Sequence, residues 1–122
     1  MFVKRVVPDF RAEQPAASAE FYSDVLGLEV VMDLGWIVTF VAPGNPAAQI
    51  SVMQQDAGAS VQPDVSIEVD DVDAAHAAAQ RLRCEILHPL TDEPWGVRRF
   101  FVRDPSGKVL NILSHPSQAS LT

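Results

Sequence analysis

The stretch FYSDVLGLEV, residues 21–30, decides how the rest of the chain is interpreted. Ala17, Phe21 and Val25 recur at every fourth position, which places them on one face of a helix. Gly27 can end that helix in the left-handed conformation, and the apolar residues after it begin a strand. The stretch therefore predicts a helix that passes directly into a strand.

The same transition recurs later in the chain. A shift of 56 residues places Leu26 on Leu82 and Glu29 on Glu85. Strand patterns surround both helices, at residues 3–10, 28–34, 36–42 and 47–55 and again at 64–69, 84–90, 98–104 and 109–113. The order β-α-β-β-β therefore occurs twice, which indicates an internal repeat.

The second helix has a polar start and an apolar stripe. Asp70 or Asp71 can cap its first turn. The stripe that we expect to pack on a sheet consists of Val72, Ala75, Ala79 and Leu82.

Two such units predict an α+β fold, with two tandem β-α-β-β-β units forming a cupped mixed sheet and a concave ligand cleft. We expect the first unit at residues 1–55, a linker at 56–63, the second unit at 64–115 and a tail at 116–122, all within a single domain.

Composition restricts the partners. Nine basic and sixteen acidic residues give a net charge of −7, which argues against nucleic acid and acidic membrane surfaces. Cys84 is the single cysteine, so an internal disulfide is excluded and a cytoplasmic location is the simplest expectation. No apolar stretch is long enough to span a bilayer.

Strand alternation places polar side chains on the predicted cleft side. Asp64, Ser66 and Glu68 share one side of their strand, while Val65, Ile67 and Val69 share the other, which should pack on a helix. Gln49 and Ser51 share a face in the first unit, and Asn111 is the polar residue of the last strand. Such positions describe a pocket that could hydrogen-bond an amphipathic ligand.

Three motifs in order carry a family likeness: FY with LG in residues 21–27, VDDVDAA at 69–75 and DPSGKVLNI at 104–112. Together with the repeat they resemble the vicinal oxygen chelate superfamily, which includes glyoxalase I, extradiol dioxygenases and bleomycin-resistance proteins. The resemblance implies two His and two Glu ligands in metal-dependent members, and it places them at Val7, Gln49, Asp64 and Asn111. Val7 has no donor atom, and the two amides are poor substitutes for carboxylates. We therefore expect no metal and no other cofactor.

The stretch EPWGVRRFF, residues 93–101, resembles the bleomycin-resistance group, whose members lack the metal site and sequester a ligand. Trp95 could project toward the cleft rim and offer a flat surface with one N–H, and Trp36 could do the same from the first unit. Both could instead fill the core or the dimer interface. Arg98, Arg99 and Arg103 lie near this stretch, and a solvated position is the default expectation for each of them. Arg99 could instead face the cleft and bind a carboxylate or phosphate.

These observations favour a metal-independent protein that binds a small molecule, sequesters an aromatic or cationic antibiotic without turnover, and forms a homodimer. The alternative is a lyase, isomerase or dioxygenase with a rearranged metal site around Asp64 and either His88 or His115. A third is a structural or regulatory partner with an empty groove. The candidate ligand-binding residues are Trp95, Trp36, Gln49, Ser51, Asp64, Ser66, Arg99 and Asn111, with no catalytic residue assigned.

Overall fold

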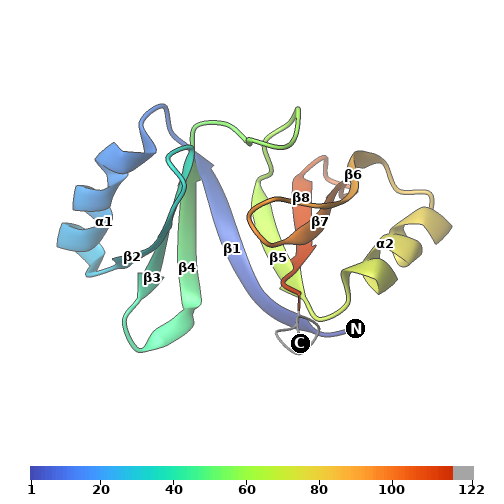
Figure 1. Ribbon diagram of the computed structural model, residues 1–122, viewed down its shortest axis with the longest axis horizontal. Helices are drawn as coiled ribbons and strands as arrows, with labels where there is room; N and C mark the ends of the chain where they lie inside the picture. The colour runs from blue at the N-terminus through green and yellow to red at the C-terminus, as the bar shows by residue number, and fades with distance from the viewer. Residues whose placement is uncertain (117–122) are drawn as a thin grey trace. The chain divides into compact units, whose positions relative to one another are not determined.

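The computed structural model describes residues 1–116, which form a mixed α+β fold of eight strands and two α-helices (Figure 1). The chain divides into two compact units. The N-terminal unit is Val6–Gln62, and the C-terminal unit combines Met1–Arg5 with the chain from Pro63 onward. The predicted boundaries at 55 and 64 stay predictions, as do the cupped shape and its cleft. Most of the predicted tail, residues 117–122, lies outside the described residues.

The N-terminal unit is a sheet with strand order β2-β3-β4-β1 and one helix. The elements are β1 (Val3–Arg11), a 3-10 turn (Pro15–Ala17), α1 (Ser18–Leu26), β2 (Glu29–Asp33), β3 (Ile37–Ala42) and β4 (Asn45–Met53). β1 pairs with β4 in parallel, and the other pairs are antiparallel. Val38, Phe40 and Val52 form the core on the helix side, where the Tyr22 ring of α1 lies 4.9 Å from the ring of Phe40.

The C-terminal unit repeats this plan with strand order β6-β7-β8-β5. Its elements are β5 (Val65–Val69), α2 (Val72–Arg81), β6 (Ile86–Asp92), β7 (Arg98–Arg103) and β8 (Val109–Ser114). β5 and β8 are parallel, and β6, β7 and β8 are antiparallel neighbours. Phe100 and Ile112 are buried beneath Val72 and the alanines of α2. The predicted order β-α-β-β-β is confirmed in each unit.

Local chemistry explains where the helices begin and end. Gly27 has a φ of 68°, and its N–H donates to the carbonyl of Ser23, which ends α1 as predicted. Asp71, one of the two predicted caps, accepts a hydrogen bond of 3.0 Å from the N–H of Ala74 at the start of α2. None of the helices within residues 1–116 is long and apolar enough to cross a membrane.

One expectation about helix packing is wrong, and the packing of α1 is a further finding. Leu82 is 72% exposed, because α2 ends at Arg81 and the next residue turns away from the sheet. Phe21, Val25 and Leu26 are more than half exposed in the chain, and the contact of α1 with the core is made by Ala19 and Tyr22. Much of the apolar surface of α1 is therefore left uncovered by its own core.

Candidate functional site

One face of the C-terminal sheet is free of helix, and a row of four side chains crosses it. The strand registers place Ser66 of β5 opposite Asn111 of β8, Asn111 opposite Phe101 of β7, and Phe101 opposite His88 of β6. These residues alternate with the core residues Ile67, Phe100 and Ile112 along their strands, so they lie on the side away from α2. We call these four residues the central row.

Asn111 is the most unusual member of the central row. The residue is only 8% exposed, and its Nδ2 donates a hydrogen bond of 3.0 Å to Ser66 Oγ. Its Oδ1 is buried and accepts no hydrogen bond from any residue in 1–116. A buried polar atom without a partner costs about 1–3 kcal/mol. Such an atom is uncommon in folded proteins and calls for an explanation.

Arg99 lies beside the central row and is almost completely buried, at 2% exposure. Its guanidinium carbon is 4.9 Å from the centre of the Trp95 ring and 4.8 Å from the centre of the Phe101 ring. The expectation that Arg99 is solvated is therefore wrong. Contacts with two aromatic faces and a charge partner, described next, compensate its desolvation.

The charge partner is Glu93, whose side chain is 6% exposed. Its Oε2 accepts a hydrogen bond of 2.6 Å from Arg99 Nε and lies 3.1 Å from His88 Nε2. Glu93 begins the turn between β6 and β7, where its N–H donates to the carbonyl of Val97. Gly96 in this turn has a φ of 95°, a conformation that favours glycine. The turn that carries Trp95 is thus fixed to the sheet by a buried ion pair.

Sequence reasoning missed Glu93 as a site residue, because an acid beside Pro94 in a turn is expected in water. The sequence offers only a partial signal for Glu93. His88 and Arg99 lie on the same side of their strands, and both flank the turn within reach of Glu93. A buried arginine there requires an acid, and Glu93 is the acid that the turn supplies.

Glu68 forms a second charged cluster on this face. Its carboxylate contacts Arg5 Nε at 2.7 Å and His115 Nδ1 at 2.7 Å. Burial alone would raise the pKa of Glu68, but the hydrogen bond from His115 and the charge of Arg5 outweigh burial and lower the pKa below its usual value. His115 therefore contacts Glu68 rather than Asp64.

Asp64 points to the backbone of its own unit. Its Oδ2 accepts a hydrogen bond of 2.8 Å from the N–H of Val109, and its own N–H donates to the carbonyl of Val109. Within residues 1–116, no three His, Cys, Asp or Glu side chains lie where they could hold one metal ion. Val7, the first position implied by the resemblance, is buried and carries no donor atom.

The predicted residues of the N-terminal unit are each engaged within that unit. Ser51 Oγ and Thr39 Oγ1 share a hydrogen bond of 2.7 Å, and Gln49 Nε2 donates to the carbonyl of Pro46 at 2.8 Å. Trp36 lies just before β3, where its carbonyl accepts from the N–H of Gln54. The structure thus brings together Ser66 with Asn111 and Trp95 with Arg99.

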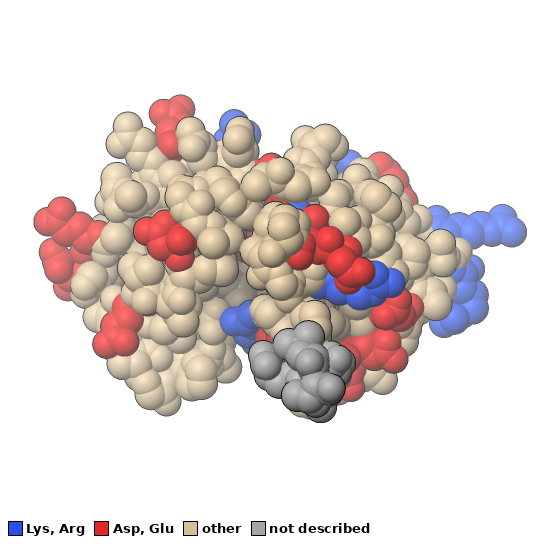
Figure 2. Space-filling model, in the orientation of Figure 1, with Lys and Arg blue, Asp and Glu red and all other residues tan. Residues whose placement is uncertain are grey.

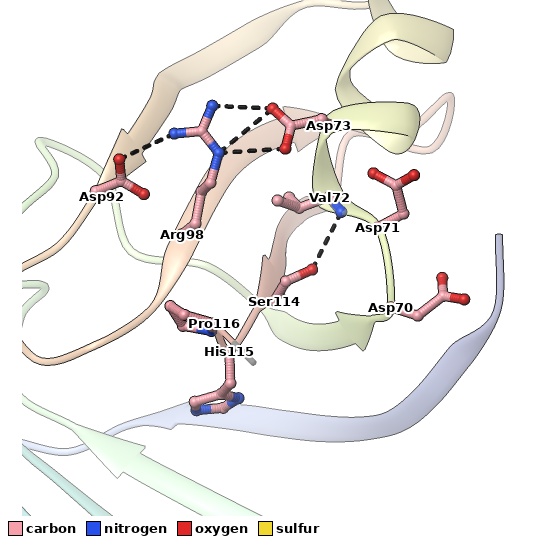
Figure 3. Close-up of a pocket in the computed structure, with 9 residues that line it drawn as sticks. All are labelled: Asp70, Asp71, Val72, Asp73, Asp92, Arg98, Ser114, His115 and Pro116. Carbon is pink, nitrogen blue, oxygen red and sulfur yellow. Dashed lines mark hydrogen bonds and ion pairs between the residues drawn. The ribbon is translucent and has the colours of Figure 1, made fainter. Parts of the chain in front are cut away.

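A separate pocket of about 320 Å³ lies where α2 begins (Figure 3). Arg98 reaches across it and donates to Asp73 Oδ1 at 2.9 Å and to Asp92 Oδ2 at 3.1 Å. The hydrogen bond from Arg98 lowers the pKa of Asp73. The first amide of α2, that of Val72, donates to Ser114 Oγ. Because these groups are engaged with one another, the pocket is a weaker candidate than the central row.

Acidic side chains are scattered over the face of the molecule shown in Figure 2, in keeping with the net charge of −7.

The fold and these motifs define the class of the protein. Residues 4–112 match the Glyoxalase/Bleomycin resistance protein/Dioxygenase superfamily, and the chain belongs to this superfamily. No curated protein matches the sequence.

Three solved structures are similar to the chain. A protein described as an NAD-dependent benzaldehyde dehydrogenase from Legionella pneumophila shares 22% identity at a TM-score of 0.70, covering 91% of this chain and 99% of that one. A superfamily member from Vibrio splendidus 12B01 shares 19% identity at a TM-score of 0.67, covering 90% of this chain and 97% of that one. Methylmalonyl-CoA epimerase from Mycobacterium tuberculosis shares 16% identity at a TM-score of 0.68, covering 99% of this chain and 92% of that one. At these identities the likeness shows a common fold.

Proposed function

We propose that this protein binds and sequesters a small aromatic molecule, such as an aromatic antibiotic, without a metal ion. The observation that carries the proposal is the buried, unpartnered Oδ1 of Asn111, at a position where the superfamily resemblance implies a metal-binding carboxylate. A neutral amide is a poor metal ligand but a good hydrogen-bonding group.

The surroundings of Asn111 support an aromatic ligand. Phe101 is its neighbour on β7, and Trp95 is held near Phe101 by their shared contact with Arg99. Aromatic side chains with a few placed polar groups are typical of small-molecule sites. Because Oδ1 is covered, a ligand reaches it only when side chains around it move aside.

The proposal is tested by a thermal-shift screen of aromatic compounds against the wild type and Asn111→Leu. Asn45→Leu, the same change at an exposed position on β4, is the matched control. A ligand at 100 times its Kd stabilises the folded chain by about 2.7 kcal/mol. We expect a compound that raises Tm for the wild type and for Asn45→Leu but not for Asn111→Leu. A compound series that stabilises all three proteins equally, or none of them, contradicts the proposal.

The second candidate is a metal-dependent lyase, isomerase or dioxygenase. It draws on the pair formed by His88 and Glu93, since an imidazole and a carboxylate are ligand types that divalent metals use. Metal analysis of protein purified without chelators separates the candidates. Stoichiometric zinc, nickel, manganese or iron that is lost in His88→Gln would favour the enzyme and overturn sequestration.

We also propose that the protein is a homodimer. Large apolar side chains are exposed on α1 and β2 of the N-terminal unit, and exposed apolar surface of this kind often marks a protein interface. The exposed residues are Phe21, Val25, Leu26, Val30 and Val31, each more than half accessible in the single chain. The cytoplasmic location expected from the single cysteine stays a prediction.

A further inference from the structure

We infer that the ligand of the central row is an uncharged, planar molecule that donates a hydrogen bond from a ring N–H or O–H to Asn111 Oδ1. This inference rests on the proposed function and narrows it, because a cationic antibiotic is then disfavoured. Three properties of the face carry it: its charges are paired, its unpartnered group is an acceptor, and the neighbour of that group is an aromatic ring.

The charged side chains around the central row already have opposite charges beside them. Arg99 is paired with Glu93 at 2.6 Å. Glu68 is paired with Arg5, and His115 adds a hydrogen bond to the same carboxylate. A charged ligand placed here would lose its hydration without gaining an uncompensated partner, which is strongly unfavourable. The electrostatics of the face therefore select a ligand without net charge.

The unpartnered group fixes the direction of the hydrogen bond. A carbonyl oxygen such as Asn111 Oδ1 accepts and cannot donate, so the ligand must supply the hydrogen. The Nδ2 of the same amide is engaged with Ser66 and holds the carboxamide in one orientation. A ligand that lacks the donor would bury the acceptor without satisfying it.

The register fixes the shape of the ligand. Phe101 lies directly opposite Asn111 on the same face of the sheet, where cross-strand side chains are about 5 Å apart. Phe101 is 0% exposed in the free chain, so a group that donates to Asn111 meets the Phe101 ring only once the covering side chains have moved aside, and a planar ring then makes the largest contact there.

Four related probes test this inference: indole, 1-methylindole, tryptamine and indole-3-acetate. Indole is neutral and donates through its N–H, 1-methylindole lacks the donor, and the other two carry opposite charges. Binding is followed by the side-chain amide signals of Asn111 in ¹⁵N-¹H spectra of the full chain. We expect indole to bind about 5- to 10-fold more tightly than 1-methylindole, since the difference is one hydrogen bond. We expect both charged probes to bind more weakly than indole.

Two variants sharpen the test. In Asn111→Leu, followed through backbone amide signals, indole and 1-methylindole should bind equally, because the acceptor is gone. In Asn111→Asp, the new unpaired negative charge should make tryptamine the tightest of the four probes, which also checks that a folded variant was measured.

The outcomes separate the two proposals. If a charged probe binds the wild type most tightly with shifts at Asn111, or if 1-methylindole equals indole, the ligand class is overturned and the proposed function stands. If none of the four shifts any signal of the central row, both fail at this face.

Discussion

Glu93 shows how much a single buried acid determines in this protein. Its carboxylate holds Arg99 in contact with two aromatic rings and also contacts His88. Removing the charge of a buried ion pair leaves its partner uncompensated, whereas the loss of an exposed ion pair has a small effect. The position of Trp95, which shares this turn, depends on Glu93.

We predict that Glu93→Gln lowers the free energy of unfolding by about 3 kcal/mol. The matched control is Glu85→Gln, whose exposed pair with Arg103 should contribute below about 1 kcal/mol. In a Trp36→Phe background the fluorescence of Trp95 can be followed alone, and its emission should shift to the red only in Glu93→Gln. Equal losses of stability in the two variants, or an unchanged Trp95 spectrum, would contradict this account.

For Asn111 we expect a substitution to raise the stability of the protein rather than lower it. Leu has the same number and branching of side-chain heavy atoms as Asn and needs no hydrogen bond, so Asn111→Leu removes a buried unpartnered oxygen. We predict that this variant is more stable than the wild type by about 1 kcal/mol in urea unfolding while losing ligand binding. A loss of stability of similar size would show that the amide serves the fold.

The site could be predicted from the sequence only in part, and the reason is physical. Alternation correctly placed Ser66 and Asn111 on one side of their strands, because side-chain direction follows from strand periodicity. Burial of Arg99 depends on a turn folding back over the sheet, which no local pattern encodes. Ligand binding by Ser66, Asn111 or Arg99 stays a prediction.

At the scale of elements, both helices and all eight strands of the described chain follow from local patterns and turn chemistry. Asp71 and Gly27 mark helix ends for reasons that depend on the backbone alone. The exposed stripe of α1 could not be predicted in the same way. An apolar helix face packs against whatever is nearest, and the sequence does not say which neighbour that is.

The Glu68 cluster joins three segments of the C-terminal unit and makes the stability of that unit depend on pH. Arg5 of β1 and His115 beyond β8 both contact Glu68 of β5, and the charge of Lys4 also lowers the pKa of Glu68. Since this pKa is lower in the folded chain than in the unfolded chain, the unfolded chain takes up the proton first as the pH falls. The stabilisation is therefore complete above the ordinary carboxyl pKa and disappears as the pH drops through the lowered value.

We predict that urea unfolding, measured from about pH 6 down to about pH 3, shows a shallower loss of stability in Glu68→Gln than in the wild type. Glu29→Gln, at an exposed position on β2, should follow the wild type. If Glu68→Gln and the wild type lose stability in parallel, the cluster does not contribute to acid unfolding.

At the scale of the whole molecule, the two units repeat one supersecondary plan with the same strand order. The repeat was visible in the sequence because the passage from helix to strand is preserved at Leu26 and Leu82. The apolar surfaces differ between the units, since α1 exposes Phe21 and Val25 while α2 covers its sheet mainly with alanines.

We predict that the wild type is a dimer by light scattering coupled to size exclusion, and that Val25→Glu is a monomer. A charge introduced into an apolar interface is desolvated without a partner, which opposes association. Leu82→Glu is the control, because it makes the same kind of change at an exposed apolar residue of the other unit. A monomeric wild type, or dissociation caused equally by both changes, would contradict the proposed interface.

The pairing of Phe2 with Asp70 has a consequence for how the chain is made. The N–H of Phe2 donates to Asp70 Oδ1, and the N–H of Asp70 donates to the carbonyl of Phe2, across a separation of 68 residues. During translation Phe2 must wait for a partner that is made 68 residues later, while Val6–Gln62 can collapse in the meantime. Closing so long a loop is slow, so we expect the pairing of Phe2 with Asp70 to be among the last contacts to form.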